Sequence, residues 1–142
     1  MAIYTGLSSL FWITSFYGCQ PSVKKPEMFA ISGKVTFNGN PVPRGEIFFQ
    51  PDADAGNSGP ASTAIIEDSK YSIDRTRGIL GGAYTIRISG FEAPGGQRAV
   101  LPEEFGAPLF KEYAIKQELS KGTTELNFDV PAENGLSPQK KK

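Results

Sequence analysis

The sequence predicts a single small domain of the all-β class, and three observations support this prediction. The chain has 142 residues, which suits one domain. Its sixteen glycines and eleven prolines fit many short strands and tight turns better than long helices. Apolar and polar residues alternate with a period of two over several short runs, and turn-forming residues separate those runs.

The clearest pair of predicted strands lies in Ala30–Pro51, which reads AISGKVTFNGNPVPRGEIFFQP. Alternation in its first half predicts a strand with one buried face. The apolar residues of that face are Phe29, Ile31, Val35 and Phe37. The opposite parity places Lys34 on the solvent side. Asn38–Asn40 is a strong turn signal, Arg44–Gly45 predicts a second turn, and Glu46–Gln50 is expected to form the second strand.

Three further strands are predicted in the middle of the chain. Ala61–Glu67 and Lys70–Asp74 both alternate, and a turn at residues 68–69 separates them. A tight two-residue turn needs a positive φ at both central residues, so Ser69 leaves a longer or different turn open. Ala83–Gly90 is the clearest central strand. Its predicted inward side chains are Tyr84, Ile86 and Ile88.

Two more strands are predicted near the C-terminal end, at Phe110–Leu119 and Thr123–Val130. Gly122 and the alternation after it favour a hairpin between them. Residues 110–119 also contain good helix formers, so a short helix is the alternative there. Residues 131–142 are polar, end in three lysines, and are expected to form a disordered basic tail.

A long irregular segment, Phe91–Leu109, separates the central strand from this last pair. Loops longer than about 15 residues in a compact domain are usually functional or mobile. The segment is therefore the candidate binding surface, and a single helical turn at Pro102–Phe105 is a further expectation.

The pattern of these residues resembles that of a known family. The stretch SGKVTFNGNPVPRGEIFFQP fits G-x-V-x-h-x-G-x-P-h-x-x-G-x-h-x-F-x-P, in which h is apolar, and GILGGAYTIRISG resembles a second family segment. Both are similar to segments of the carboxypeptidase-regulatory-like, transthyretin-like domains found in short lipoproteins of planctomycete bacteria. The resemblance implies a seven-strand, Greek-key-like (transthyretin/prealbumin-like) β-sandwich over residues 29–130. The matching positions of the first segment are Gly33, Val35, Phe37, Gly39, Pro41, Val42, Gly45, Ile47, Phe49 and Pro51.

The N-terminal segment suggests export and lipid attachment. Residues 1–18 carry no charged side chain, and they are too short and too weakly apolar for a membrane-spanning helix of about 20 apolar residues. Their end at Gly18, followed by Cys19, resembles the lipobox of bacterial lipoproteins. That resemblance implies a signal peptide over residues 1–18, a lipid on Cys19 and a tether over residues 19–28. Cleavage by signal peptidase I instead of signal peptidase II stays open, and Gln20 implies sorting to the outer membrane.

The composition excludes several kinds of chemistry. Histidine is absent, so the commonest general base and the Ser-His and Cys-His pairs are absent too. A single cysteine, Cys19, can form neither an intrachain disulfide nor a cysteine-based zinc site. Fifteen basic and fifteen acidic residues cancel, which gives no global field to attract nucleic acid. We therefore expect no metal, no cofactor and no nucleic-acid partner.

Carboxylates are the remaining candidates for catalysis. They fall on outward parities or in loops, where solvation keeps carboxyl groups ionised, so no catalytic residue is assigned. The carboxylates considered are Glu46, Glu67, Asp68, Asp74, Glu92, Glu103 and Glu104. Asp52–Pro60 is expected to be a solvated loop. A Lys–Asn isopeptide bond needs buried partners, whereas Lys34 and Asn127 both have outward parities.

The expected function is therefore non-catalytic. The sequence predicts an extracytoplasmic module that binds or supports other components of a bacterial envelope, in the outer membrane or periplasm. Its expected partners are the membrane, through the N-terminal lipid, and an envelope protein or glycan. The alternative is an envelope hydrolase that uses carboxylates.

Overall fold

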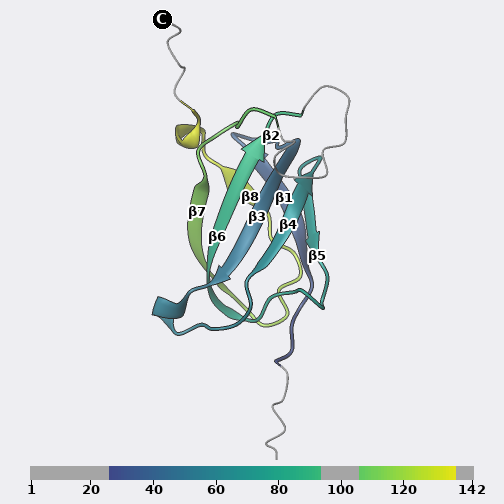
Figure 1. Ribbon diagram of the computed structural model, residues 1–142, viewed down its shortest axis with the longest axis vertical. Helices are drawn as coiled ribbons and strands as arrows, with labels where there is room; N and C mark the ends of the chain where they lie inside the picture. The colour runs from purple at the N-terminus through teal and green to yellow at the C-terminus, as the bar shows by residue number, and fades with distance from the viewer. Residues whose placement is uncertain (1–25, 94–105, 137–142) are drawn as a thin grey trace, which may run out of the picture.

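The computed structural model describes residues 26–93 and 106–136, and within these ranges the chain is all-β, as predicted (Figure 1). The described residues contain no α-helix, and their only helical turns are the short 3-10 turns η1 (Ala53–Ala55) and η3 (Ala132–Asn134). The strands are β1 (Ile31–Phe37), β2 (Asn40–Pro41), β3 (Arg44–Pro51), β4 (Ser62–Glu67), β5 (Lys70–Ile73), β6 (Gly82–Phe91), β7 (Tyr113–Leu119) and β8 (Phe128–Val130).

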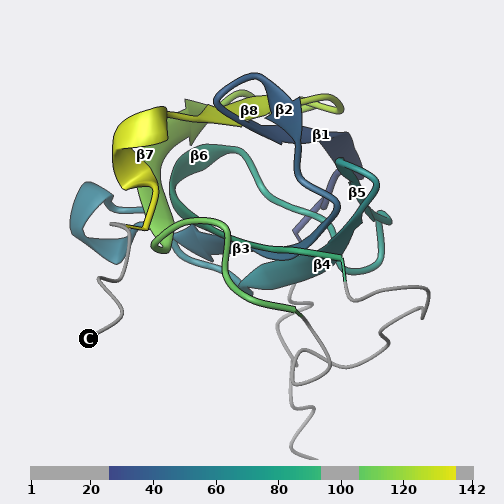
Figure 2. The ribbon, with the colours of Figure 1, turned by 90° about the horizontal axis from the view of Figure 1, so that it is seen from above.

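The strands form one strongly curled sheet. Their order is β2-β1-β5-β4-β3-β6-β7 with antiparallel neighbours, and β8 joins β1 in parallel. Strands β4 and β5 pair only through Glu67 and Lys70, whereas β4 pairs with β3 at six positions. The sheet bends at this weak junction, so that β1, β2 and β8 lie across the interior from β3 and β4 (Figure 2).

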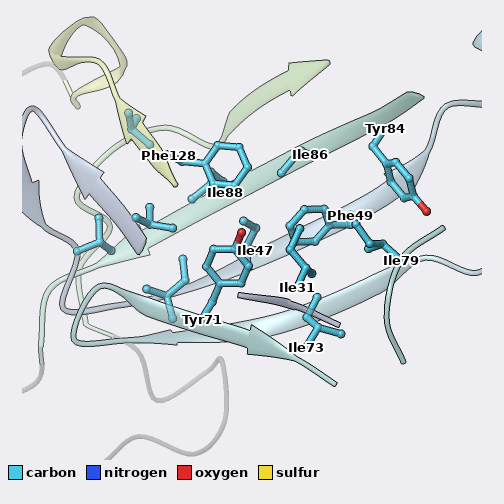
Figure 3. Packing of buried hydrophobic residues seen from close by; sticks show 14 of the residues in the cluster. Ile31, Ile47, Phe49, Tyr71, Ile73, Ile79, Tyr84, Ile86, Ile88 and Phe128 are labelled. Atoms are coloured by element: carbon cyan, nitrogen blue, oxygen red, sulfur yellow. The ribbon is translucent and has the colours of Figure 1, made fainter. Parts of the chain in front are cut away.

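The core lies between the two sides of the curled sheet. It is built from the residues that the alternation places inward, including Ile31 and Val35 of β1 and Tyr84, Ile86 and Ile88 of β6. Figure 3 shows how these side chains meet, with the Tyr71 ring close to two other aromatic rings. Its ring centre lies 5.9 Å from that of Phe49 and 6.4 Å from that of Phe128.

The two tightest turns both have a positive φ at two successive residues. Asn38 and Gly39 have φ values of 48° and 76°, which fits the predicted turn between β1 and β2. Asp68 and Ser69 have φ values of 48° and 65°, so the longer turn considered for Ser69 does not form. The reason is backbone hydrogen bonding: the Asp68 and Ser69 amides donate to carbonyls of the segment between β2 and β3.

The turn predicted at Arg44–Gly45 is wrong, because both residues belong to β3. Gly45 pairs with Ile66 on one side and with Gly90 on the other. A side chain there would not fit, since a Cβ atom would lie 2.2 Å from the Ser89 carbonyl oxygen. This glycine allows close packing inside a strand. In the sequence alone, such a glycine cannot be distinguished from one that forms a turn.

The predicted hairpin at the C-terminal end is also wrong, although residues 113–119 do form the favoured strand and not a helix. Strand β7 pairs with β6, whereas β8 crosses to the other side of the sheet and pairs with β1. Inward parity is correct for Leu126, Phe128 and Val130, of which the last two are buried. Alternation fixes which side chains face the core, but it does not fix which strand lies alongside.

The ordered part of the chain continues beyond the predicted domain boundary at Val130. The Lys111 amide donates to the Asn134 carbonyl at 2.9 Å, and Phe110 pairs with Gly135. The first residues of the expected tail are therefore held against the start of β7, and residues 137–142 lie outside the described ranges. The start of β1 and η3 lie towards opposite ends of the long axis (Figure 1).

Candidate functional site

Two of the predicted functional features lie wholly or partly outside the described residues. Cys19, the signal segment and most of the tether fall within residues 1–25, which the structure does not describe. The predicted helical turn Pro102–Phe105 and most of the candidate binding loop are likewise not described. The ends of that loop are paired with each other: Glu92 donates its amide to the Ala107 carbonyl at 2.8 Å.

The candidate carboxylates do not gather in one site: of those described, Glu67 and Asp68 line one groove, whereas Glu46, Asp74 and Glu92 lie outside it. Of the seven, Glu103 and Glu104 lie outside the described ranges. Glu46 accepts a hydrogen bond from the Thr63 hydroxyl, and Glu67 lies 3.7 Å from the Arg44 guanidinium. Asp74 accepts hydrogen bonds from the Thr76 hydroxyl and from two following backbone amides. Each of these three groups is engaged in a local contact.

Asp52 is a buried carboxylate that the sequence reasoning missed. It was expected in a solvated loop, but it is only 8% exposed and its carboxylate lies 2.8 Å from the Lys116 ammonium of β7. The hydrogen bond from Lys116 holds the pKa of Asp52 below its usual value, and the same contact raises the pKa of Lys116. The only signal in the sequence was that Asp52 directly follows a strand and precedes η1, whose first turn it caps.

Asp129 has a similar structural role. Its carboxylate accepts hydrogen bonds from the Thr36 hydroxyl at 2.6 Å and from the Gly39 amide at 3.0 Å. The Thr36 contact, followed by the Gly39 contact, keeps the pKa of Asp129 low. The pKa of Asp74 is also lowered, first by Thr76. These acids stabilise turns, and none of them is held in the protonated form that a general acid needs.

An open groove of about 670 Å³ lies among polar side chains on the outer face of the sheet. We call it the seam groove, because it lies where β4 and β5 separate. It is lined by residues 32–34 of β1, residues 65, 67 and 68 of β4 and its turn, residues 70–72 of β5, and Glu125 and Asn127. The sequence reasoning did not find this site, since its residues come from three separate stretches of the chain.

The pairing of β1 with the chain leading into β8 is interrupted beside the groove, between the Ser32–Glu125 and Val35–Phe128 pairs. In this interval the Leu126 carbonyl accepts a hydrogen bond from the Tyr71 hydroxyl at 2.7 Å. The Asn127 side chain instead accepts from the Lys34 amide at 2.8 Å. A Cβ atom on Gly33 would lie 1.8 Å from the Leu126 carbonyl oxygen, so only glycine fits there. Gly33, Tyr71 and Asn127 therefore act together to shape this part of the groove.

No group of three or more possible metal-ligating His, Cys, Asp or Glu residues occurs in the described part of the chain. Within the same residues, no helix is long and apolar enough to cross a membrane.

No family model, curated protein or solved structure matches this chain. The family resemblance carried by the sequence motifs therefore stays a prediction.

Proposed function

We propose that the protein is a non-catalytic binding module, anchored to a bacterial envelope through a lipid on Cys19. The seam groove is its binding surface, together with the loop at residues 91–109. One contrast carries this proposal. The side chains of Asp52, Asp74 and Asp129 are engaged in structural contacts, whereas the seam groove is open and accessible. Such a surface suits reversible binding better than catalysis in a closed, water-excluding pocket.

We further propose that the curled sheet is a seven-strand, Greek-key-like β-sandwich of the transthyretin-like type. The weak junction between β4 and β5 supports this, because one residue pair joins the β1 side of the sheet to the β3 side. The crossing from β7 to β8 also supports it, since a chain that changes layers is typical of Greek-key connections.

A carboxylate-based hydrolase is less well supported. The acids of the groove are Glu67, Asp68 and Glu125, and the first of these lies beside the Arg44 guanidinium. A retaining or inverting hydrolase needs one carboxyl group held protonated in a low-polarity site. An open groove gives no such site.

The anchoring is tested by metabolic labelling with an alkyne analogue of palmitate in a bacterial host. We expect the wild-type chain to be labelled and to enter the membrane fraction, and Cys19→Ala to be unlabelled. Globomycin should make the wild-type precursor accumulate. Labelling that persists in Cys19→Ala would contradict lipid attachment at Cys19.

A further inference from the structure

Two lysines stand side by side in the seam groove. Lys34 of β1 and Lys70 of β5 are direct partners in the antiparallel register, and both are exposed. Side chains at such positions have Cβ atoms about 5 Å apart, and like charges there destabilise a sheet. Neither ammonium group has an ion-pair partner among the residues that the structure describes. The fold therefore places two like charges side by side in the seam groove.

Among the described residues, the acids of the groove form no ion pair with either lysine. Glu67 is the register partner of Lys70 on β4, but its carboxylate lies 3.7 Å from the Arg44 guanidinium. Glu125 accepts a hydrogen bond from the Asn127 side chain at 3.3 Å. Asp68 belongs to the exposed turn, where it forms no ion pair with either lysine. The lysine pair is thus available to an anionic group from another molecule.

An aliphatic side chain lies near the lysine pair at a defined spacing. Ile65 is 38% exposed, which is unusual for a large apolar residue in the part of the chain that the structure describes. It precedes Glu67 by two residues on β4, and Glu67 is level with Lys70. Two residues along a strand span about 6.6 Å, which is also the spacing of same-face side chains in any extended peptide.

Small residues leave room for a peptide backbone between these features. Ser32, Gly33 and Ser72 line the groove beside the lysine pair, and none of them has a bulky side chain. Tyr71 contributes little exposed ring, since it is 3% exposed and donates its hydroxyl to the Leu126 carbonyl. The groove therefore lacks the exposed aromatic face on which a sugar ring would stack.

We propose that the seam groove binds an extended polypeptide segment that carries an acidic and an aliphatic side chain two positions apart. The acidic side chain binds between Lys34 and Lys70, and the aliphatic side chain packs on Ile65. This inference rests on the proposed binding function and names its class of partner. Strands β1, β4 and β5 run along the long sides of the molecule, not across the end at which the described chain begins (Figure 1). With an N-terminal anchor, the groove faces sideways to neighbouring proteins and not towards the lipid surface.

The binding test uses the full chain in detergent micelles and a fluorescein-labelled heptapeptide, Gly-Ser-Glu-Thr-Val-Ser-Gly. Fluorescence anisotropy should show saturable binding that weakens as sodium chloride rises from 50 to 500 mM. We expect Lys34→Gln and Lys70→Gln each to weaken binding at least fivefold, and Ile65→Ser to weaken it similarly. Lys111→Gln, at an exposed lysine outside the groove, is the matched control and should bind like the wild type.

A stability measurement tests the charge argument independently of any ligand. Lys34→Glu converts the repulsive pair into an attractive one, so we expect a higher urea midpoint of unfolding together with loss of peptide binding. A lower midpoint for both Lys34→Glu and Lys70→Glu would overturn the charge argument.

Further outcomes separate the possible partners. Equal binding of the peptide by Lys34→Gln and the wild type would overturn the inference, as would equal affinity for a peptide with Gln in place of Glu. Binding to phosphatidylglycerol vesicles that Lys34→Gln abolishes, without any peptide binding, would assign the groove to lipid and overturn it too. None of these measurements depends on lipid attachment, so the groove inference and the anchoring at Cys19 fail separately.

Discussion

At the scale of single residues, polar side chains complete the backbone hydrogen bonding that the strands leave open. The Tyr71 hydroxyl donates to the Leu126 carbonyl beneath the seam groove, and burial raises the pKa of this phenol, so it remains a neutral donor. The Asn127 and Asp129 side chains accept hydrogen bonds from the backbone amides of Lys34 and Gly39, respectively. These contacts explain why outward-facing polar residues near β8 are important for the fold.

The Tyr71 contact leads to a stability prediction. Tyr71→Phe leaves the partly buried Leu126 carbonyl without its donor, and because a fully buried unsatisfied acceptor costs about 1–3 kcal/mol, we expect a loss of about 1 kcal/mol. Urea unfolding should show this loss. Tyr113→Phe is the control, because the half-buried Tyr113 makes no hydrogen bond with its hydroxyl among the described residues. A similar loss in both variants would contradict the assignment.

Three aspartates predict a dependence of stability on pH. The pKa values of Asp52, Asp74 and Asp129 are all lowered in the folded state. Their stabilisation is therefore complete above the unfolded pKa of about 3.9 and is lost as the pH falls through the folded values. We expect the melting temperature to be constant near neutral pH and to fall below about pH 4. Asp129→Asn should flatten this fall, and an unchanged acid limb would contradict the role of Asp129.

Ser69 predicts a stabilising substitution. Its φ of 65° is in the left-handed region, which costs a non-glycine residue about 1–2 kcal/mol. Glycine removes this cost but adds about 0.5–1 kcal/mol of backbone entropy, so Ser69→Gly should gain about 0.5–1 kcal/mol. Ser72→Gly, in the extended β5, should instead lose a similar amount. Thermal unfolding of the two variants tests the sign directly.

At the scale of strands, Gly33 shows how closely two segments approach. Gly33→Ala would bring a Cβ atom against the Leu126 carbonyl oxygen, and we expect a loss of about 3 kcal/mol from this overpacking. Gly39→Ala is the matched control, because Gly39 has a φ of 76° and open space around its Cβ position. It should lose only the left-handed cost of about 1 kcal/mol. Chemical denaturation distinguishes the two, and equal losses would contradict a collision at Gly33.

The same scale shows how far the sequence predicts this fold. Alternation correctly identified the inward residues of β1, β6 and β8, because burial of one face follows directly from a period of two. The partner of β8 was missed, since the β1–β8 register joins residues such as Val35 and Phe128 that are far apart in the chain. Gly45 was mistaken for a turn because a glycine required by close packing and a glycine required by φ look identical in a sequence.

At the scale of the whole molecule, the candidate site could not be predicted from local pattern. Outward parity correctly exposed Lys34, but the pairing of Lys34 with Lys70 arises only when β1 meets β5. The groove beside them arises from the separation of β4 and β5, which depends on the curl of the entire sheet. Alternation therefore predicted that Lys34 is exposed, but its pairing with Lys70 depends on the tertiary structure.

The parallel pairing of β1 and β8 has a mechanical consequence. These strands are the first and last of the described chain, they run in the same direction, and hydrogen bonds from Ser32 to Asn38 join them to residues 124–130. A force between the two ends of the chain pulls them past each other lengthwise, and it loads all of these bonds together instead of opening them one by one. Pulling on handles at both ends in optical tweezers should therefore give a single abrupt rupture, and gradual extension at low force would contradict this. A module tethered at one end would be able to hold a load at the other.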